Sequence, residues 1–136
     1  MPVRKMEEKD KAEVQKMAAE LLPESQDLYE FKDEEVFIWE KEDGSLGGFV
    51  SVSIRPWVDG SDSEPCPHIE GWYVKKELRR QGIGQSLIEA IEKWAKERGF
   101  DEITSDAEFD NKDSLEAHNS LGFEKTELIQ YFKKKL

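Results

Sequence analysis

The chain has 136 residues, enough for one folded domain with a hydrophobic core and too few for two ordinary domains. Its formal net charge of -11 argues against binding to a phosphate backbone and is compatible with a cationic small-molecule partner, although acidity for solubility fits the charge equally well. The single cysteine excludes an internal disulfide, two histidines argue against a metal site, and the lack of a long apolar run argues against a membrane span and predicts a cytoplasmic location.

The first half of the chain predicts a strand, a helix and a hairpin. Residues 2–6 are expected to form a short strand, and Asp10-x-x-Glu13 has the spacing of a capping box for a helix with one apolar face made of Val14, Met17, Ala18 and Leu21. Pro23 follows that helix, and the segment 25–32 is ambiguous, with a short second helix as one interpretation. Residues 36–41 and 46–54, joined by a turn at 42–45, predict a β-hairpin.

The second half alternates strands and helices. The turn-rich segment 55–67 is expected to be a long loop of the kind that often carries function. A strand is expected at 68–74, followed by a long helix whose buried side holds Ile83, Leu87, Ile88, Ile91, Trp94 and Ala95. After Gly99 the pattern predicts a strand at 102–109, a short helix at 114–121 and a terminal strand at 123–132. This order predicts one α+β (mixed α/β) domain over residues 1–136, with helices packed on the faces of a mixed sheet.

A glycine-containing segment, Arg79-Arg80-Gln81-Gly82-Ile83-Gly84, lies where a strand passes into the first turn of a helix. Free backbone N–H groups and the positive end of the helix dipole face outward at such a place, which suits a phosphate group. The two glycines allow close approach of the backbone, and the two arginines add positive charge. A helix start with incidental glycines is the alternative. The segment lacks the Gly-Lys-Ser/Thr of a Walker loop and the third glycine of a dinucleotide-binding fingerprint.

A second motif makes the first more specific. Arg79-x-x-Gly82-x-Gly84, followed downstream by Asn111-x-x-Ser114-x-x-x-His118-x-x-x-Gly122-Phe123, resembles the acyl-CoA site of the GNAT superfamily of N-acetyltransferases. The resemblance implies a twisted mixed sheet of about six to seven strands with about four helices, whose splayed central strands hold acetyl-CoA. It also implies acetyl transfer to a primary amine by direct attack in a ternary complex, without a metal.

The resemblance assigns the donor site to the strand at 68–74, the glycine loop and the next short helix. Its implied acetyl-CoA-binding residues are Trp72, Tyr73, Val74, Arg79, Arg80, Gln81, Gly82, Ile83, Gly84, Gln85, Asn111 and Ser114. The tyrosine that usually protonates the departing CoA thiolate is replaced by His118, and an imidazole can do this near neutral pH. The alternatives are that His118 only packs beside Leu121, or that the thiolate leaves without a dedicated acid.

Within the superfamily, the segments IEGWYV, RRQGIG, SDAEFDN and AHNSLGFEKTELIQYF are most similar to aminoglycoside 6′-N-acetyltransferases, which confer antibiotic resistance. This likeness implies an acceptor site made of Glu70, Asp106 and Glu127, with Trp57 as a stacking wall. A polycationic acceptor needs several carboxylates, and one of them must help to remove a proton before the amine attacks. An ion-paired or edge-exposed carboxylate is the alternative for Glu70, and a solvated strand face is the alternative for Asp106.

Three features leave alternatives open. Leu22 stands where those enzymes tend to place an aromatic residue, so a polyamine, a small metabolite or a peptide N-terminus is an alternative acceptor, and a non-catalytic acyl-CoA-binding module is a further alternative. Cys66 is a poor candidate nucleophile because it has no histidine partner adjacent in sequence, although proximity to His68 in space stays open. The resembling enzymes are often dimers, and the aromatic pair Tyr131-Phe132 could serve a homodimer interface.

Overall fold

The computed structural model describes residues 2–21 and 28–136. Its strands and α-helices follow in the order β1 (Val3–Lys5), α1 (Lys11–Leu21), β2 (Glu35–Glu40), β3 (Leu46–Arg55), β4 (Cys66–Val74), α2 (Ile83–Glu97) and α3 (Lys112–Ser120). Two short 3-10 helices precede α1 and α2, namely η1 (Glu8–Asp10) and η2 (Lys76–Leu78). None of the helices in the described residues is long and apolar enough to cross a membrane.

The four strands form one antiparallel sheet in the order β1-β2-β3-β4. The predicted hairpin is confirmed: β2 pairs with β3 through a turn in which Lys41 N–H donates to the carbonyl of Ser45 at 2.8 Å. Gly44 occupies the left-handed region of that turn, with φ +88°, where a side chain would be strained. The predicted loop between β3 and β4 is also confirmed.

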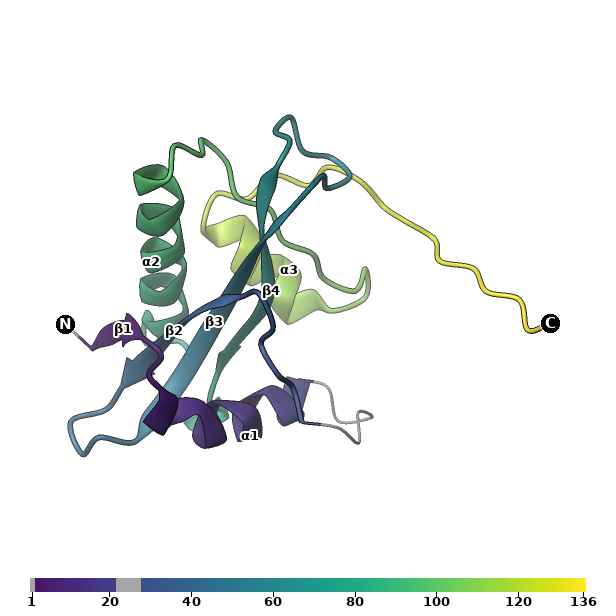
Figure 1. Cartoon of the computed structure of the whole chain (residues 1–136). Helices are drawn as coiled ribbons and strands as arrows, with labels where there is room; N and C mark the ends of the chain where they lie inside the picture. Colours follow the sequence, from purple (N-terminus) through teal and green to yellow (C-terminus); the bar gives the residue numbers. More distant parts are fainter. Residues whose placement is uncertain (1, 22–27) are drawn as a thin grey trace.

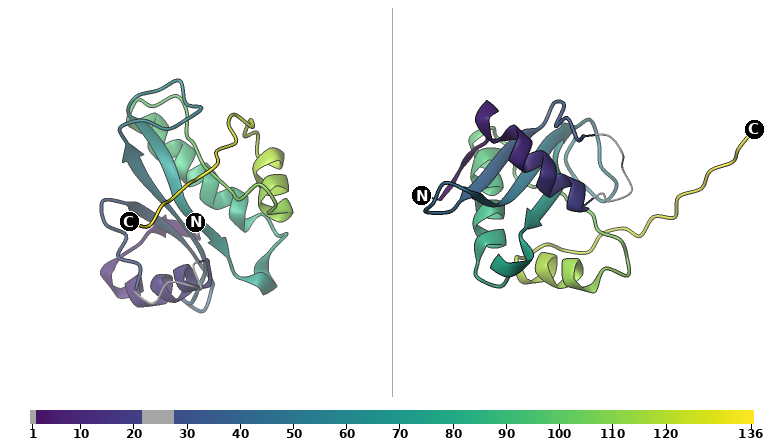
Figure 2. Two further views of the ribbon diagram at one scale, coloured as in Figure 1. Left: turned by 90° about the vertical axis from the view of Figure 1, so that its right-hand side faces the viewer. Right: turned by 90° about the horizontal axis from the view of Figure 1, so that it is seen from below.

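The two long helices cover opposite faces of the sheet, as Figure 1 and the view from below in Figure 2 show. Alternation along β2 explains this, because Val36 and Ile38 pack with α1 while Phe37 and Trp39 contact the core under α2. On α2 the buried residues are the six that the helical period predicts, Ile83, Leu87, Ile88, Ile91, Trp94 and Ala95. The apolar period of α1 is confirmed for Val14, Met17 and Ala18, whereas Leu21 is exposed.

The sheet is smaller than expected. Residues 102–109 were expected to form a strand, yet they meet the sheet only through one parallel bridge, between His68 and Thr104. Residues 123–132 were expected to form a terminal strand, and instead they run as an extended, exposed segment away from the body of the molecule (Figure 1). Both segments have strand-like sequences, but a strand needs a neighbour for its backbone hydrogen bonds, and neither finds one along its length. The described residues therefore hold four strands and three α-helices, fewer than the expected six to seven and four.

The start of α1 also differs from expectation. The capping box was expected at Asp10-x-x-Glu13, but it lies one turn earlier, where the Glu7 N–H donates to Asp10 Oδ2 at 2.8 Å. Glu13 instead accepts the N–H of Leu46, at 2.8 Å, and so ties α1 to β3. The described part of the ambiguous segment, residues 28–32, contains no helix, while Leu22, Pro23 and residues 24–27 lie outside the described residues.

Candidate functional site

The glycine loop lies at the N-terminus of α2, as the sequence predicts. Gly82 is the N-cap of α2 and has φ +83°, and Arg80 just before it is also in the left-handed region, at φ +65°. A Cβ at Gly82 would meet no atom within 4 Å, so the loop is open to solvent on that side. A Cβ at Gly84 would lie 3.2 Å from the Trp72 ring, whose Nε1–H donates to the Gly84 carbonyl at 3.3 Å. The loop is thereby held against the end of β4 with the first N–H groups of the helix unpaired within it.

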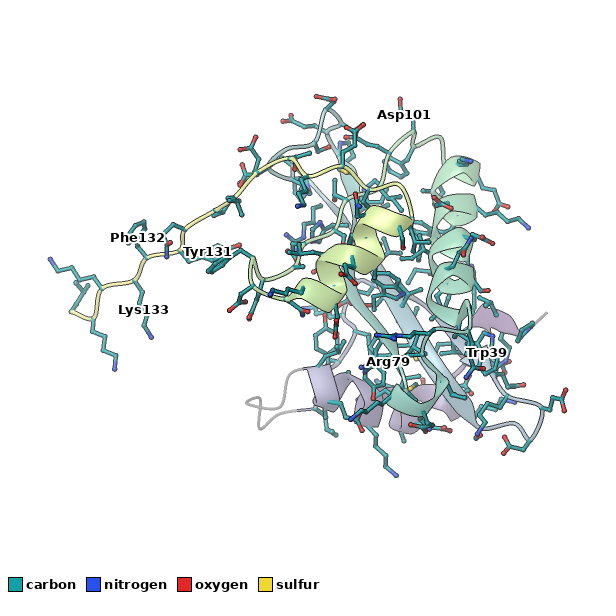
Figure 3. All side chains as sticks on the ribbon, turned by 180° about the vertical axis from the view of Figure 1, so that it is seen from behind. Trp39, Arg79, Asp101, Tyr131, Phe132 and Lys133 are labelled. Atoms are coloured by element: carbon teal, nitrogen blue, oxygen red, sulfur yellow. The ribbon has the colours of Figure 1, made fainter. Side chains whose placement is uncertain are left out.

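The two arginines of this loop behave differently. Arg79 turns back onto β4, where its Nε–H donates to the Val74 carbonyl at 2.8 Å and its guanidinium lies 5.5 Å from the centre of the Tyr73 ring (Figure 3). Arg80 is exposed. Burial, followed by hydrogen bonding to Glu20 of α1, raises the pKa of Tyr73, so its hydroxyl stays protonated at neutral pH. Arg79 is exposed as well but braces the end of β4, whereas Arg80 makes no such contact among the described residues.

A second wall of the site begins where residues 104–109 leave β4. The Ile69 N–H donates to the Thr104 carbonyl at 2.8 Å, and the Thr104 N–H donates to the Pro67 carbonyl at 3.0 Å. Beyond this point the two segments make no ladder, and we call the region between them the opening; α3 packs beside it, since His118 contacts Trp72 of β4. The expected splay between two central strands is not formed, because residues 104–109 are not a strand and β4 is the edge of the sheet; the two segments only part after Thr104.

His118 on α3 lines this opening. Its ring makes edge contacts with Trp72 and Phe123, at centroid separations of 5.2 and 5.1 Å. Nδ1 lies 2.7 Å from the Ser114 carbonyl, which can only accept, so Nδ1 carries a proton. In the neutral ring Nε2 is then an acceptor, 2.7 Å from the hydroxyl of Ser105. His118 packs against Trp72 and Phe123 and is also hydrogen-bonded to the Ser105 hydroxyl. This geometry is compatible with a packing role and with a role as proton donor.

Asn111 and Ser114 have a structural role that the sequence analysis did not include. Asn111 is the N-cap of α3, and its Oδ1 accepts the Ser114 N–H at 3.1 Å. The Ser114 carbonyl accepts from His118. These two residues of the second motif therefore shape α3 and orient the imidazole beside the opening.

Glu70 owes its position to a β-bulge. The pairing of β3 with β4 shifts register between Ser51 and Val52, which face Gly71 and Ile69 and leave Glu70 unpaired between them. A bulge re-aims a side chain, here toward Arg55, whose Nη2 and Nε lie 2.7 and 2.9 Å from the two Glu70 oxygens. The Ser53 hydroxyl donates to the same carboxylate at 2.5 Å. The alternative of an ion-paired Glu70 is thus the one observed.

Electrostatics keep Glu70 and Asp106 ionised. Burial acts to raise the pKa of Glu70, but hydrogen bonds from Arg55 and Ser53 outweigh it and the pKa is lowered. The pKa of Asp106 is lowered chiefly by hydrogen bonding to His68, whose Nε2 is 3.3 Å from Asp106 Oδ2. Arg55 and His118 lower the pKa of Asp106 further. The acceptor side of the site is therefore anionic at neutral pH.

The other two expected acceptor residues lie on neighbouring segments. Trp57, on the loop after β3, exposes 61% of its surface and is free to contact a ligand. Glu127 is exposed and runs beside the same loop, because a Cβ at Gly60 would lie 3.2 Å from Glu127 Cγ and would overlap Thr126. Trp57 and Glu127 thus share one rim, while no direct contact joins them to Glu70 or Asp106 among the described residues.

Three groups next to these carboxylates were not predicted from the sequence. From the sequence, Arg55 was only the first residue of the expected loop 55–67. His68 was only the first residue of the expected strand 68–74 and a residue that could lie near Cys66 in space. The third group is a pair, in which the Tyr29 hydroxyl donates to Glu34 at 2.5 Å, and burial raises the pKa values of both. Glu34 and Tyr29 both respond electrostatically to Glu70 and Arg55, so the pair belongs to the same polar region. An apolar-strand sequence interrupted by Ser51, Ser53 and Arg55 at alternate positions was the available signal.

Cys66 is buried, and its contacts do not form a nucleophile–base pair. Its Sγ lies 3.4 Å from the Pro67 carbonyl and 3.7 Å from the Thr104 hydroxyl. The ring of His68 bonds to that same hydroxyl and to Asp106. The imidazole is thus directed to Asp106 through one nitrogen and to Thr104 through the other.

Comparison with known proteins adds a family and several relatives. Residues 4–123 match the family model described as the acetyltransferase (GNAT) family. An aminoglycoside N(6′)-acetyltransferase type 1 from Klebsiella aerogenes is 40% identical over 94 residues, which cover 69% of this chain and 62% of that relative. One from Stenotrophomonas maltophilia is 35% identical over 99 residues, or 72% of this chain and 65% of that relative. The chain thus matches less than two thirds of the length of these relatives.

Solved structures resemble the chain over nearly all of its length. AAC(6′)-Iy in complex with the bisubstrate analogue CoA-S-monomethyl-acetylneamine superimposes with a TM-score of 0.87 at 29% identity, covering 98% of this chain and 97% of that one. The aminoglycoside 6′-N-acetyltransferase AAC(6′)-Ih from Acinetobacter baumannii gives a TM-score of 0.82 at 27% identity, with the same coverage of both chains. The overall fold of the chain is therefore shared with these aminoglycoside acetyltransferase structures.

Proposed function

The chain belongs to the acetyltransferase (GNAT) family, and we propose that it transfers an acetyl group from acetyl-CoA to the 6′-amine of an aminoglycoside by direct attack in a ternary complex. The observation that carries this proposal is the arrangement along β4. The glycine loop packs on Trp72 near the end of β4, Glu70 lies on the same strand, and Asp106 lies on the neighbouring segment, where it contacts His68 of β4. An anion-binding loop beside two ionised carboxylates suits an acyl-CoA donor and a cationic acceptor.

On the donor side, acetyl-CoA supplies the activated acetyl group when it is bound. The open N-terminus of α2 fits an anionic group, because Gly82 leaves free space and Gly84 brings the backbone close to Trp72. Arg80 adds an exposed cation to the loop. Once it carries a second proton on Nε2, His118 can donate that proton to the Ser105 hydroxyl oxygen, 2.7 Å away, as this hydroxyl gives its own proton to the departing thiolate.

On the acceptor side, the proposal draws on the two carboxylates and on the relatives. Glu70 is held by Arg55 and Ser53, and Asp106 lies 3.3 Å from His68 with its side chain exposed, so both carboxylates can face an ammonium group. The curated relatives are named as aminoglycoside N(6′)-acetyltransferases, and one similar structure contains an acetylneamine linked to CoA. Trp57 and Glu127 stand on the rim, where they can contact the outer rings of such a ligand.

A second acceptor class is favoured by one observation. Arg55 is a cation inside the anionic region, and it occupies both oxygens of Glu70. This reduces the negative charge that is free to hold a polycation, so a smaller amine such as a polyamine or a peptide N-terminus is the second candidate. A protein that binds acyl-CoA without catalysis would release no thiol with any amine.

The test is an assay of CoA thiol release with a panel of acceptors. Kanamycin and tobramycin should be turned over with a higher kcat/KM than spermidine or a dipeptide, and an aminoglycoside with a hydroxyl in place of the 6′-amine should be inert. Negligible turnover of the antibiotics beside rapid turnover of another amine would replace the acceptor. CoA binding without thiol release from any acceptor would leave only the non-catalytic alternative.

The donor half is tested separately with Gly82→Asp, which places negative charge against the anion site. We expect the dissociation constant for CoA, measured by calorimetry, to rise at least ~100-fold, since charge repulsion adds to the loss of a close approach. Gly82→Asn has the same size without the charge and should weaken binding less. Gly44→Asp is the matched control, because Gly44 also has a positive φ and open space but lies in the β2–β3 turn. Equal CoA affinity in Gly82→Asp and wild type would mean that CoA binds elsewhere.

A cytoplasmic location, expected from the lack of a long apolar run, and a homodimer, expected from the resemblance, also belong to this proposal. The homodimer is supported by the exposed segment 124–136, in which Tyr131 and Phe132 expose 83% and 90% of their surfaces (Figure 3). Aromatic residues exposed in this way are typical of interfaces with a partner. A mass from light scattering, compared before and after truncation at residue 123, tests the homodimer.

A further inference from the structure

His68 is a buried imidazole behind the carboxylate of Asp106. Only 2% of its surface is exposed, although it stands near the start of β4 in the polar region of the site. Nδ1 lies 2.9 Å from the Thr104 hydroxyl oxygen, and Nε2 lies 3.3 Å from Asp106 Oδ2. The side chain of Asp106 is 75% exposed, so Asp106 is the only one of these three groups that reaches toward solvent and a ligand.

The directions of the hydrogen bonds follow from their partners. The Thr104 hydroxyl donates to the Pro67 carbonyl at 2.9 Å, so its oxygen is left to accept from His68. Nδ1 therefore carries a proton, and in the neutral ring Nε2 has a lone pair aimed at an anionic oxygen. The one vacant proton site of the ring is thus directed at Asp106. A proton placed there bonds to Oδ2, which agrees with the lowered pKa of Asp106.

The surrounding charges come from three elements. Glu70 on β4 interacts electrostatically with His68, and Arg55 on β3 interacts electrostatically with Asp106. His118 on α3 acts on Asp106 from the other side of the opening. On the buried side the ring meets only neutral partners, Thr104 and behind it Cys66. The imidazole can accept one proton, and Asp106 is the group through which a proton reaches it.

The proposed reaction needs such an acceptor. An aminoglycoside amine arrives as an ammonium ion and attacks only after it loses a proton, while carboxylates with lowered pKa values are weak bases. An imidazole is a stronger base than a carboxylate and suits this task near neutral pH. Glu70 cannot supply the base, because Arg55 and Ser53 already hold its oxygens.

We propose that His68 is the final acceptor of the proton that leaves the acceptor's ammonium group, with Asp106 passing it on. This inference rests on the proposed function. The ammonium N–H bond breaks as an O–H bond forms on Asp106, and rotation of this exposed carboxyl group presents the proton to Nε2. The O–H bond then breaks as the Nε2–H bond forms, which restores the carboxylate. The freed amine lone pair forms the C–N bond as the C–S bond of the thioester breaks, and the imidazolium later returns its proton to solvent through Asp106.

The matched variants are His68→Gln and His68→Phe. Glutamine can still donate a hydrogen bond to Asp106 but cannot take up a proton, whereas phenylalanine fills the space without either property. For His68→Gln we expect kcat to fall at least ~100-fold, the usual scale of general base catalysis, with the KM of the acceptor nearly unchanged. The acidic limb of the wild-type profile of kcat/KM against pH should be absent. Wild-type kcat and an unchanged pH profile in His68→Gln would overturn the inference, even if the variant were less stable.

Nitrogen NMR of the imidazole tests the same link without activity. The chain has two histidines, so His118→Asn leaves a single ring to follow. We expect Nδ1 to keep its proton throughout the titration, Nε2 to gain one, and the midpoint of this gain to move to lower pH in Asp106→Asn. An unchanged midpoint would overturn the proton link. If no acceptor is acetylated, the proposed function fails whatever the spectra show, whereas acetylation with a wild-type His68→Gln removes only this inference.

Discussion

Two clusters in this molecule set an arginine against carboxylates, and they differ in how completely the charges are enclosed. At the β1 edge, Arg4 reaches Asp10 at 2.7 and 3.1 Å and Glu40 at 2.8 Å. Beside β4, Arg55 holds Glu70 at 2.7 and 2.9 Å, and the neighbouring Asp106 contacts His68. The first cluster is closed, since Asp10 is buried and also accepts the N–H of Glu7.

The second cluster is open. Arg55 and Asp106 expose 42% and 75% of their side chains, and one buried oxygen of Glu34 has no hydrogen-bond partner within the described residues. In a closed cluster, hydrogen bonds and ion pairs between the groups offset the free energy of removing them from water, so the cluster stabilises the fold. In an open cluster, charged groups stay accessible to a ligand. An arginine–carboxylate pair can therefore be structural when its charged groups are buried together, and functional when a charged group near it stays exposed to a ligand.

The largest expected effect lies in the open cluster. Asp106→Asn should lower kcat/KM at least ~100-fold, because it removes the group that takes the ammonium proton, with a melting temperature close to that of the wild type. Steady-state kinetics and thermal unfolding measure the two quantities. Glu108→Gln removes an exposed carboxylate two residues away and should change neither. If the melting temperature of Asp106→Asn fell so far that unfolding explained the loss of kcat/KM, the open cluster would be structural like the closed one.

The closed cluster should respond in the opposite way. Asp10→Asn should lower the free energy of unfolding by about 2 kcal/mol, the scale of hydrogen bonds to a charged group, and leave kcat unchanged. Arg4 lowers the pKa of Asp10 in the folded chain, so this contribution is present above the unfolded pKa and is lost as pH falls through the folded one. Urea unfolding of both proteins should therefore converge in acid.

The control for the closed cluster is Glu7→Gln. Glu7 is exposed and only 3.5 Å from Arg4 at its nearest atoms, so its loss should change the free energy of unfolding by less than ~0.5 kcal/mol. A kcat that falls in Asp10→Asn at full folding would show that the β1 edge also serves the site.

The smallest expected effect concerns Glu34, at the margin of the open cluster. Burial is the main cause that raises the pKa of Glu34, so its contribution to stability is complete below the unfolded pKa and is lost as pH rises through the folded one. Glu34→Gln mimics the protonated form and should stabilise the fold at pH 7 by less than ~1 kcal/mol. Urea midpoints at pH 7 and in acid should show a gain that disappears in acid, while the exposed control Glu124→Gln should show none. If Glu34→Gln were less stable than the wild type at pH 7, interactions in the folded chain would have to stabilise the ionised carboxylate of Glu34.

Much of the fold could be predicted because its signals are local. The helical period fixed the six buried residues of α2, and alternation with an Asp-Gly turn indicated the β2–β3 hairpin. The glycine loop was also found at its true place, the N-terminus of α2, since its chemistry lies in adjacent residues. The terminal segment 123–132 was wrong as a strand, because alternation indicates only that a segment could pair and not that a neighbour is present.

The candidate site divides in the same way. Residue type and spacing were enough to predict the family resemblance and a glycine loop suited to an anion, and the resemblance in turn pointed to Glu70 and Asp106 as acceptor residues. Only the tertiary structure decided that a bulge turns Glu70 toward Arg55, 15 positions away, and that His68 meets Asp106 across 38 positions. Register and long-range contacts depend on how the whole sheet pairs, and a change of one residue in register moves a side chain to the other face. The chemical groups of the chain are visible in its sequence, whereas the contacts between them form only when the sheet pairs.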